Sequence, residues 1–196
     1  MTSYDDRTAL LVVDVQNDFA DPKGSLYVVG GEAVAAVVNA EIAGAREAGA
    51  LVVYSQDWHP ESTPHFQTDG GVWPVHCVGG TWGAEFHPRL DVPTDAIFLQ
   101  KGTGGEDGYS VFTVRDPETG ERAPTALERI LREHGVERVV VVGLATDYCV
   151  KDTALDALRL GFPARVVVAA IRAVNLEEGD GDRAVDAMRD AGAELV

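Results

Sequence analysis

Three residues that lie far apart in the chain could together perform nucleophilic catalysis. Cys149 supplies a thiol, Asp14 supplies a carboxylate that could accept the thiol proton, and Lys101 supplies an ammonium group that could stabilise both charges. Thr146 or Asp147 could cap a helix that begins here, which would place Cys149 in the first turn, where the helix dipole favours a thiolate. Taken one at a time, each residue has a simpler structural interpretation, and it is their combination that favours chemistry.

A second set of residues has the composition of a metal site. Asp57 and His59 are two positions apart, so in an extended segment both side chains point to the same side. His65 and His76 follow in the same segment. Three imidazoles and one carboxylate suit zinc, iron or manganese, and we expect one divalent ion, with zinc as the first choice. Histidines that occur in a loop by chance are the alternative, and His87 is a candidate replacement ligand.

The elements that must position these residues are short apolar runs. They are rich in Val, Leu and Ile, and nearly every position is apolar, which is typical of strands buried on both faces of a parallel sheet. The five runs are Ala9 to Val13, Ala50 to Tyr54, Ala96 to Leu99, Val139 to Val142 and Val166 to Ala170. Glu194 to Val196 could add a sixth strand.

Helical periodicity separates most of these strands. The predicted helices are Glu32 to Ala48, Ala123 to His134, Tyr148 to Leu160 and Asp180 to Ala191. The alternation predicts an α/β fold, a doubly wound and mostly parallel sheet of five or six strands with helices on both faces, in one domain spanning residues 1–196. Ligands of such sheets bind beyond the carboxyl ends of the strands, where Asp14, Asp57, Lys101 and Cys149 all occur.

One long segment, from Asp57 to about Pro93, has no sustained period and is rich in Pro and Gly. Irregular segments of this length in compact domains are usually binding or lid segments. Three aromatic residues near the motifs, Phe19, Trp73 and Tyr109, could stack on a flat ring, although core packing is the default for each.

Composition excludes several classes of protein. The 196 residues hold 16 Lys and Arg against 32 Asp and Glu, and the net charge of −16 would repel nucleic acid and anionic membranes. The sequence contains no apolar stretch of membrane-spanning length, and the opening residues lack the basic start of a signal peptide. We therefore expect a cytoplasmic protein. Only two cysteines occur, Cys77 and Cys149, so a disulfide framework is excluded.

Several motifs together resemble those of the nicotinamidases, within the isochorismatase-like cysteine hydrolases. The resemblance covers nearly the whole chain. The motifs are Asp14-Val15-Gln16-Asn17-Asp18-Phe19, Asp57-Trp58-His59-Pro60, Trp73-Pro74-Val75-His76-Cys77-Val78, Lys101-Gly102 and Ala145-Thr146-Asp147-Tyr148-Cys149-Val150. The chain departs from many members at Gly79-Gly80-Thr81 and over residues 102–112, which bears on the shape of the pocket.

The resemblance implies a reaction and a role for each residue. Cys149 would attack the carboxamide carbon of nicotinamide, Asp14 would act as base and then as acid, and Lys101 would support both, so that ammonia leaves and nicotinic acid forms through a thioester. The backbone N–H groups of Ala145 and Cys149 would form the oxyanion hole, beside a cis peptide between Leu144 and Ala145.

The resemblance also implies ligands and partners. Asp57, His59, His65 and His76 would hold the metal, which would meet the pyridine nitrogen, and Phe19, Trp73 and Tyr109 would contact the ring. Pyrazinamide is a further candidate substrate, and a homo-oligomer is a candidate assembly.

Three alternatives remain open on the sequence alone. The first is another amidase of the superfamily that acts on an N-carbamoyl or ureido compound without a metal. The second is a metal-binding or ligand-binding protein that performs no catalysis. The third is a zinc site that only stabilises the fold.

Overall fold

A six-stranded parallel sheet forms the centre of the molecule, in the strand order β3-β2-β1-β6-β7-β8. It is seen in a computed structural model that describes residues 4–196. The strands are β1 (Thr8–Val13), β2 (Leu51–Asp57), β3 (Ile97–Lys101), β6 (Arg138–Leu144), β7 (Ala164–Arg172) and β8 (Glu194–Leu195). The predicted sheet, with the sixth strand included, is confirmed. Residues 1–3, part of the opening segment from which we expect no signal peptide, lie outside the described residues.

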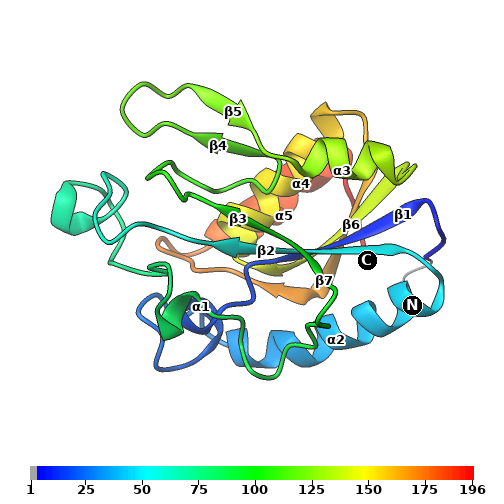
Figure 1. Ribbon diagram of the computed structural model, residues 1–196, viewed down its shortest axis with the longest axis horizontal. Helices are drawn as coiled ribbons and strands as arrows, with labels where there is room; N and C mark the ends of the chain where they lie inside the picture. Colours follow the sequence, from blue (N-terminus) through cyan, green and yellow to red (C-terminus); the bar gives the residue numbers. More distant parts are fainter. Residues whose placement is uncertain (1–3) are drawn as a thin grey trace.

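Helices cover both faces of this sheet, as expected (Figure 1). The helices α1 (Asn17–Ala20) and α2 (Gly31–Glu47) lie on one face, and α3 (Leu127–Glu133), α4 (Lys151–Arg159) and α5 (Asp180–Asp190) lie on the other. Strand β1 shows why, because its side chains alternate between two hydrophobic clusters. Leu10 and Val12 pack in the cluster of α2, whereas Leu11 and Val13 pack in the cluster of α3 and α4.

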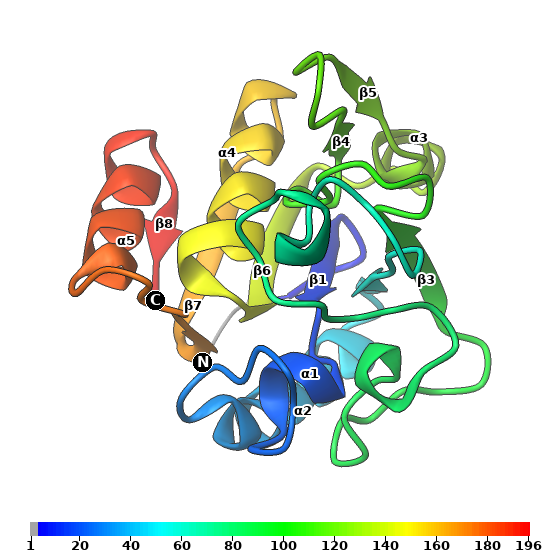
Figure 2. The same cartoon turned by 90° about the vertical axis from the view of Figure 1, so that its left-hand side faces the viewer.

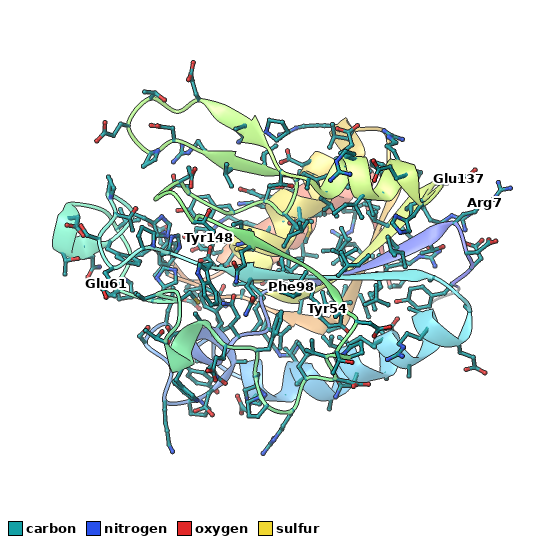
Figure 3. All side chains as sticks on the ribbon, in the orientation of Figure 1. Arg7, Tyr54, Glu61, Phe98, Glu137 and Tyr148 are labelled. Atoms are coloured by element: carbon teal, nitrogen blue, oxygen red, sulfur yellow. The ribbon has the colours of Figure 1, made fainter. Side chains whose placement is uncertain are left out.

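The edge strand β3 departs from the expectation of burial on both faces. Phe98 is 54% exposed, whereas Ile97 and Leu99 pack against the cluster on the other side of the strand. The apolar run Ala96 to Leu99 therefore forms the predicted strand, but an edge position leaves one of its faces open to solvent. Figure 3 shows the Phe98 side chain on this strand. In the same view, Arg7 and Glu137 lie at one end of the sheet and Tyr148 lies toward the other.

A small antiparallel hairpin corrects one predicted helix boundary. Strands β4 (Thr113–Arg115) and β5 (Arg122–Pro124) pair with each other, so Ala123 lies in a strand, and the helix predicted from this residue begins at Leu127. Pro124 disfavours helical backbone at the residue before it. The hydroxyl oxygen of Thr125 then accepts a hydrogen bond from the N–H of Leu127 at 3.1 Å, at the start of α3.

The long segment after β2 is irregular, as predicted, apart from two short 3₁₀ turns, η1 (Gln67–Asp69) and η2 (Trp82–Ala84). Figure 2 shows that this segment crosses the edge of the sheet where the strands end. The strand order reverses between β1 and β6, so this is also the edge at which ligands of doubly wound sheets bind. Among residues 4–196, no helix has the length and apolar character that crossing a membrane requires.

Candidate active site

The three residues of the proposed catalytic set meet at the carboxyl edge of the sheet. Asp14 follows β1, Lys101 ends β3, and Cys149 lies just after β6. The Lys101 Nζ atom is 2.7 Å from Asp14 Oδ2 and 3.6 Å from Cys149 Sγ. All three residues are buried, with exposures of 0% for Asp14, 1% for Lys101 and 7% for Cys149. The structure therefore brings an acid, an amine and a thiol into direct contact.

Ser55, a residue that the sequence did not single out, holds the other oxygen of Asp14. Its hydroxyl donates a hydrogen bond to Asp14 Oδ1 at 2.6 Å, and its carbonyl accepts a bond from the Asp14 N–H at 3.3 Å. The backbone of Asp14 has a φ of 46°, which is rare for a residue other than glycine and turns the chain directly after β1. A serine within an apolar strand was the only sequence signal for this contact.

Burial and charge set the protonation of the Asp14 and Lys101 pair. Burial raises the pKa of the Asp14 carboxyl above its ordinary value, although the charge of Lys101 opposes the shift. For Lys101, burial acts to lower the pKa, but the carboxylates of Asp14 and Asp57 outweigh it, and the pKa lies well above the ordinary value. A carboxylate with a raised pKa is a stronger base, and the lysine beside it stays charged.

The predicted cap at Thr146 or Asp147 is wrong, since Ala145 precedes the helical turn that holds Cys149, whereas the effect of the helix dipole on the thiol stays a prediction. Burial raises the pKa of the Cys149 thiol well above its ordinary value, although the charge of Lys101 opposes the shift. The residue lies in a π-helical turn, η3 (Thr146–Val150), whose start has no side-chain cap. The carboxylate of Asp147 instead accepts hydrogen bonds from the N–H groups of Val174 and Asn175 in the segment after β7. Burial therefore favours the protonated thiol, and a base beside it would be needed to form the nucleophile.

The peptide bond between Leu144 and Ala145 is cis, as the family resemblance implies. Ala145 and Cys149 both line the pocket described below. Their position is compatible with an oxyanion hole formed by their N–H groups, which stays a prediction.

The four predicted metal ligands also converge. The ligand atoms of His59, His65 and His76 lie within 4.8 Å of one another. Asp57 Oδ2 is 3.0 Å from His59 Nε2 and 3.3 Å from His76 Nε2. All four residues are buried, whereas His87 lies outside the cluster. Burial alone does not bring three imidazoles and a carboxylate together, and this donor set fits a divalent metal such as zinc.

Hydrogen bonds orient these donors. His76 Nδ1 bonds to the carbonyl oxygen of Pro74 at 2.8 Å, and His65 Nδ1 bonds to Asp107 Oδ1 at 2.7 Å. If each Nδ1 carries the proton, each Nε2 keeps a free lone pair, as a metal ligand requires. Burial lowers the pKa of His65, which favours the neutral imidazole that metals bind.

Asp57 belongs to both groups of residues. Its Oδ2 atom faces the histidines, whereas its Oδ1 atom is 3.3 Å from Lys101 Nζ. Burial acts to raise the pKa of this carboxyl, but the charges of Lys101 and His59 outweigh it and hold the pKa well below its ordinary value. Gln16 fixes the backbone, since its Nε2 donates to the Asp57 carbonyl at 2.7 Å and its Oε1 accepts from the Asp57 N–H at 2.8 Å.

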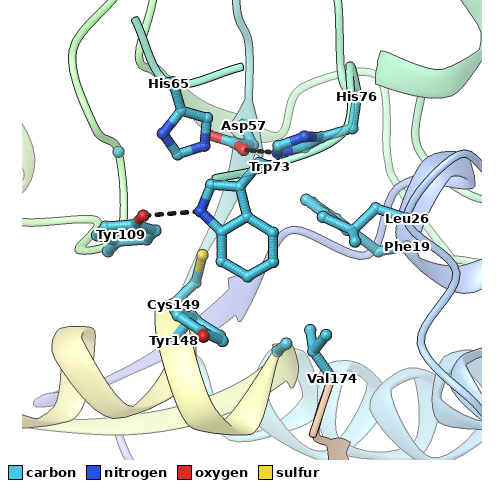
Figure 4. A pocket seen from close by; sticks show the side chains of 12 residues that line it. Phe19, Leu26, Asp57, His65, Trp73, His76, Tyr109, Tyr148, Cys149 and Val174 are labelled. Atoms are coloured by element: carbon cyan, nitrogen blue, oxygen red, sulfur yellow. Dashed lines mark hydrogen bonds and ion pairs between the residues drawn. The ribbon is translucent and has the colours of Figure 1, made fainter. Parts of the chain in front are cut away.

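A pocket of about 370 Å³, part of it open to solvent, lies between the thiol and the metal cluster (Figure 4). Phe19, Trp73 and Tyr109 all line it, and the indole N–H of Trp73 donates to the Tyr109 hydroxyl at 2.8 Å. Four further wall residues were not predicted as site residues, although Tyr148 lies in the same motif as Cys149. These are Leu26, Gly108, Tyr148 and Val174.

Known proteins show which family has this arrangement. The isochorismatase domain matches residues 8–196. The chain belongs to the isochorismatase family. One relative is the nicotinamidase/pyrazinamidase of Mycobacterium tuberculosis. It is 42% identical to this chain over 192 residues, which cover 96% of this chain and 97% of the relative.

Two solved structures have the same fold. The pyrazinamidase of Pyrococcus horikoshii in complex with zinc superposes on this chain with a TM-score of 0.86 at 41% identity, over 97% of this chain and 98% of the other. PnC1 from L. infantum in complex with nicotinate has a TM-score of 0.89 at 35% identity, over 100% of this chain and 95% of the other.

Proposed function

We propose that this protein is an amidohydrolase that converts nicotinamide into nicotinic acid and ammonia through a thioester on Cys149. One observation carries the proposal: an aromatic pocket is lined by Cys149, whose sulfur contacts the Lys101 and Asp14 pair, and also by Asp57, His65 and His76 of the metal cluster. Relatives named for nicotinamide and pyrazinamide hydrolysis, and a structural neighbour that holds nicotinate, support a pyridine carboxamide as the substrate.

The first half of the reaction forms the thioester. Asp14 accepts the proton of the Cys149 thiol as the sulfur attacks the carboxamide carbon, and the ammonium group of Lys101, 3.6 Å from the sulfur, stabilises the developing thiolate. The carbonyl oxygen becomes an oxyanion that the N–H groups of Ala145 and Cys149 accommodate. Asp14 then donates the proton to the amide nitrogen, the C–N bond breaks, and ammonia leaves.

The second half releases the acid. Asp14, again ionised, accepts a proton from a water molecule as its oxygen attacks the thioester carbon. The C–S bond breaks, the thiol of Cys149 regains the proton, and nicotinic acid departs. The raised pKa of Asp14 suits a group that accepts and donates a proton in turn.

Asp57, His59, His65 and His76 would hold one divalent ion, with zinc as the first choice and iron or manganese as the alternatives. When bound, this ion would accept the pyridine nitrogen and so orient the ring. The aromatic walls formed by Phe19, Trp73 and Tyr109 would contact the faces and edges of the ring. Pyrazinamide has a nitrogen at the corresponding position, so we propose it as a second substrate.

The proposal is tested by ammonia release from nicotinamide, pyrazinamide and an N-carbamoyl amino acid, and by the consumption of isochorismate, which contains no nitrogen. We expect release from the two ring amides alone and complete loss of activity in Cys149→Ala. The matched control is Cys77→Ala, because Cys77 is the other buried thiol and lies outside the pocket lining. Turnover of the N-carbamoyl compound alone would favour the metal-free amidase, and full activity in Cys149→Ala would exclude this nucleophile.

A further inference from the structure

Of the three histidines in the cluster, His65 is the one whose second ring nitrogen bonds to a side chain from outside its own loop. His76 Nδ1 bonds to Pro74, two residues away. His59 Nδ1 is buried and has no hydrogen-bond partner among the residues that the structure describes. His65 Nδ1 bonds to Asp107 Oδ1 at 2.7 Å, across 42 positions of sequence.

Asp107 is itself fixed at every polar group. Its backbone pairs with Arg115 of the β4–β5 hairpin through two hydrogen bonds, Asp107 N to Arg115 O at 2.7 Å and Arg115 N to Asp107 O at 2.9 Å. Arg115 Nε and Nη2 both donate to Asp107 Oδ2, at 3.1 and 2.6 Å. One carboxylate oxygen of Asp107 therefore bonds to His65, and the other accepts hydrogen bonds from Arg115. The Asp107 side chain is 5% exposed and the His65 side chain 4%, so both lie away from solvent.

We propose that Asp107 is a positioning residue for the metal centre, which holds His65 with Nε2 free for the ion, and that Arg115 fixes Asp107 in turn. The inference rests on the metal site of the proposed function. A carboxylate that accepts the second N–H of a ligating histidine fixes the tautomer and ring orientation, and losing it typically weakens metal binding about 10- to 100-fold. His65 needs this support because its loop segment has no strand or helix to hold it.

The test measures zinc affinity rather than activity. Metal-free protein is titrated with zinc against a competing chelator for wild type, Asp107→Asn, Arg115→Ala, Arg122→Ala and His65→Ala. We expect Asp107→Asn to bind zinc about 10- to 100-fold more weakly. Arg115 is half-exposed, and exposed ion pairs contribute little, so Arg115→Ala should lose only a few-fold.

Arg122→Ala is the matched control. Arg122 pairs with Arg115 across the same hairpin, but its guanidinium is 3.7 Å from Asp156 and makes no contact with Asp107. We expect its zinc affinity to equal that of wild type. If Asp107→Asn fails to fold by circular dichroism, the comparison of Arg115→Ala with Arg122→Ala decides, and equal affinities in these two variants would overturn the proposal.

A double-mutant cycle separates positioning from a general structural role. In the His65→Ala background, Asp107→Asn should cause no further loss of zinc affinity, because its effect acts through His65. An equal loss in both backgrounds, or wild-type affinity in Asp107→Asn, would overturn the inference alone. Wild-type protein that holds no zinc, iron or manganese would instead overturn the metal site of the proposed function, and this inference with it.

Discussion

Asp14 is the residue on which both halves of the proposed reaction depend. Replacing it by Asn keeps the shape and removes the base, while Ser55 and Lys101 retain a partner of the same size. We expect Asp14→Asn to lower the turnover of nicotinamide about 10²- to 10⁴-fold with the fold retained. Ammonia release gives the rate, circular dichroism gives the fold, and Asp116→Asn on the exposed hairpin turn is the control. Activity within a few-fold of wild type would show that another group is the base.

The pH profile reports on the same carboxyl group. The base acts when ionised, so activity falls as the pH decreases through its pKa. Because burial raises the pKa of Asp14, against the charge of Lys101, we expect the acid limb of kcat/KM to lie above the pH range of an ordinary aspartate. Lys101, whose pKa is raised by its carboxylate partners against the effect of burial, should keep its charge through neutral pH. The profile is measured with the metal content checked at each pH, and an acid limb at the ordinary aspartate pH would contradict it.

Residue types and spacing predicted that Asp14, Lys101 and Cys149 would converge and that the histidines would cluster, and the structure places them together. Their roles in catalysis and metal binding stay predictions. The supporting residues were not predictable in this way. Ser55 contacts Asp14 because β1 and β2 are adjacent in the sheet. Asp107 contacts His65 because the loop between β3 and β4 lies beside the irregular segment after β2. The burial that raises the pKa of the Cys149 thiol, against the charge of Lys101, was likewise not predictable from the local sequence.

At the scale of elements, Gly143 allows β6 to pass close to β1 just before the site. Its φ is +116°, and a Cβ atom there would lie 2.0 Å from the Val13 carbonyl oxygen. We expect Gly143→Ala to lower the free energy of unfolding by about 3 kcal/mol or more, since backbone strain and a backbone clash add together.

Urea denaturation measures this loss of stability, with Gly49→Ala as the matched control. Gly49 has a φ of +73° and no atom within 4 Å of the added Cβ, so its replacement should cost only the backbone term, about 1 to 2 kcal/mol. Equal losses in the two variants would show that β6 moves aside without cost.

Hydrophobic periodicity predicted the sheet and the long helices, because a strand buried on both faces and a helix such as α2 each repeat one pattern over many residues. The hairpin was missed because each of its strands has only three residues. The exposed Phe98 was missed because an apolar run does not reveal which strand lies at the edge of the sheet.

At the scale of the whole molecule, stability and metal binding should be separable. Both hydrophobic clusters pack on the faces of the sheet and consist of apolar side chains, most of them from strands and helices, whose packing needs no metal. We expect chelation to abolish nicotinamide hydrolysis but to leave a cooperative thermal transition. The free energy of unfolding should fall only by the contribution of ion binding, about 2.7 kcal/mol if the ion is present at 100 times its Kd. Differential scanning calorimetry with and without chelator gives the answer. A chelated protein without a cooperative transition would identify a zinc site that mainly stabilises the fold.

Several whole-molecule expectations stay predictions. They are a single domain over residues 1–196, a cytoplasmic location and a homo-oligomer. The net charge of −16 still argues against nucleic acid as a partner.

Asp57 has a consequence for the choice of substrate. A single carboxylate contacts both the histidine cluster and the lysine whose Nζ lies 3.6 Å from the sulfur, so in the proposed function it would fix the separation between a bound ion and the nucleophile. Such a fixed separation would favour one spacing of ring nitrogen and amide, and we expect isonicotinamide, the para isomer, to release ammonia more slowly than nicotinamide, the meta isomer. Selectivity among positional isomers would thus follow from the length of one side chain.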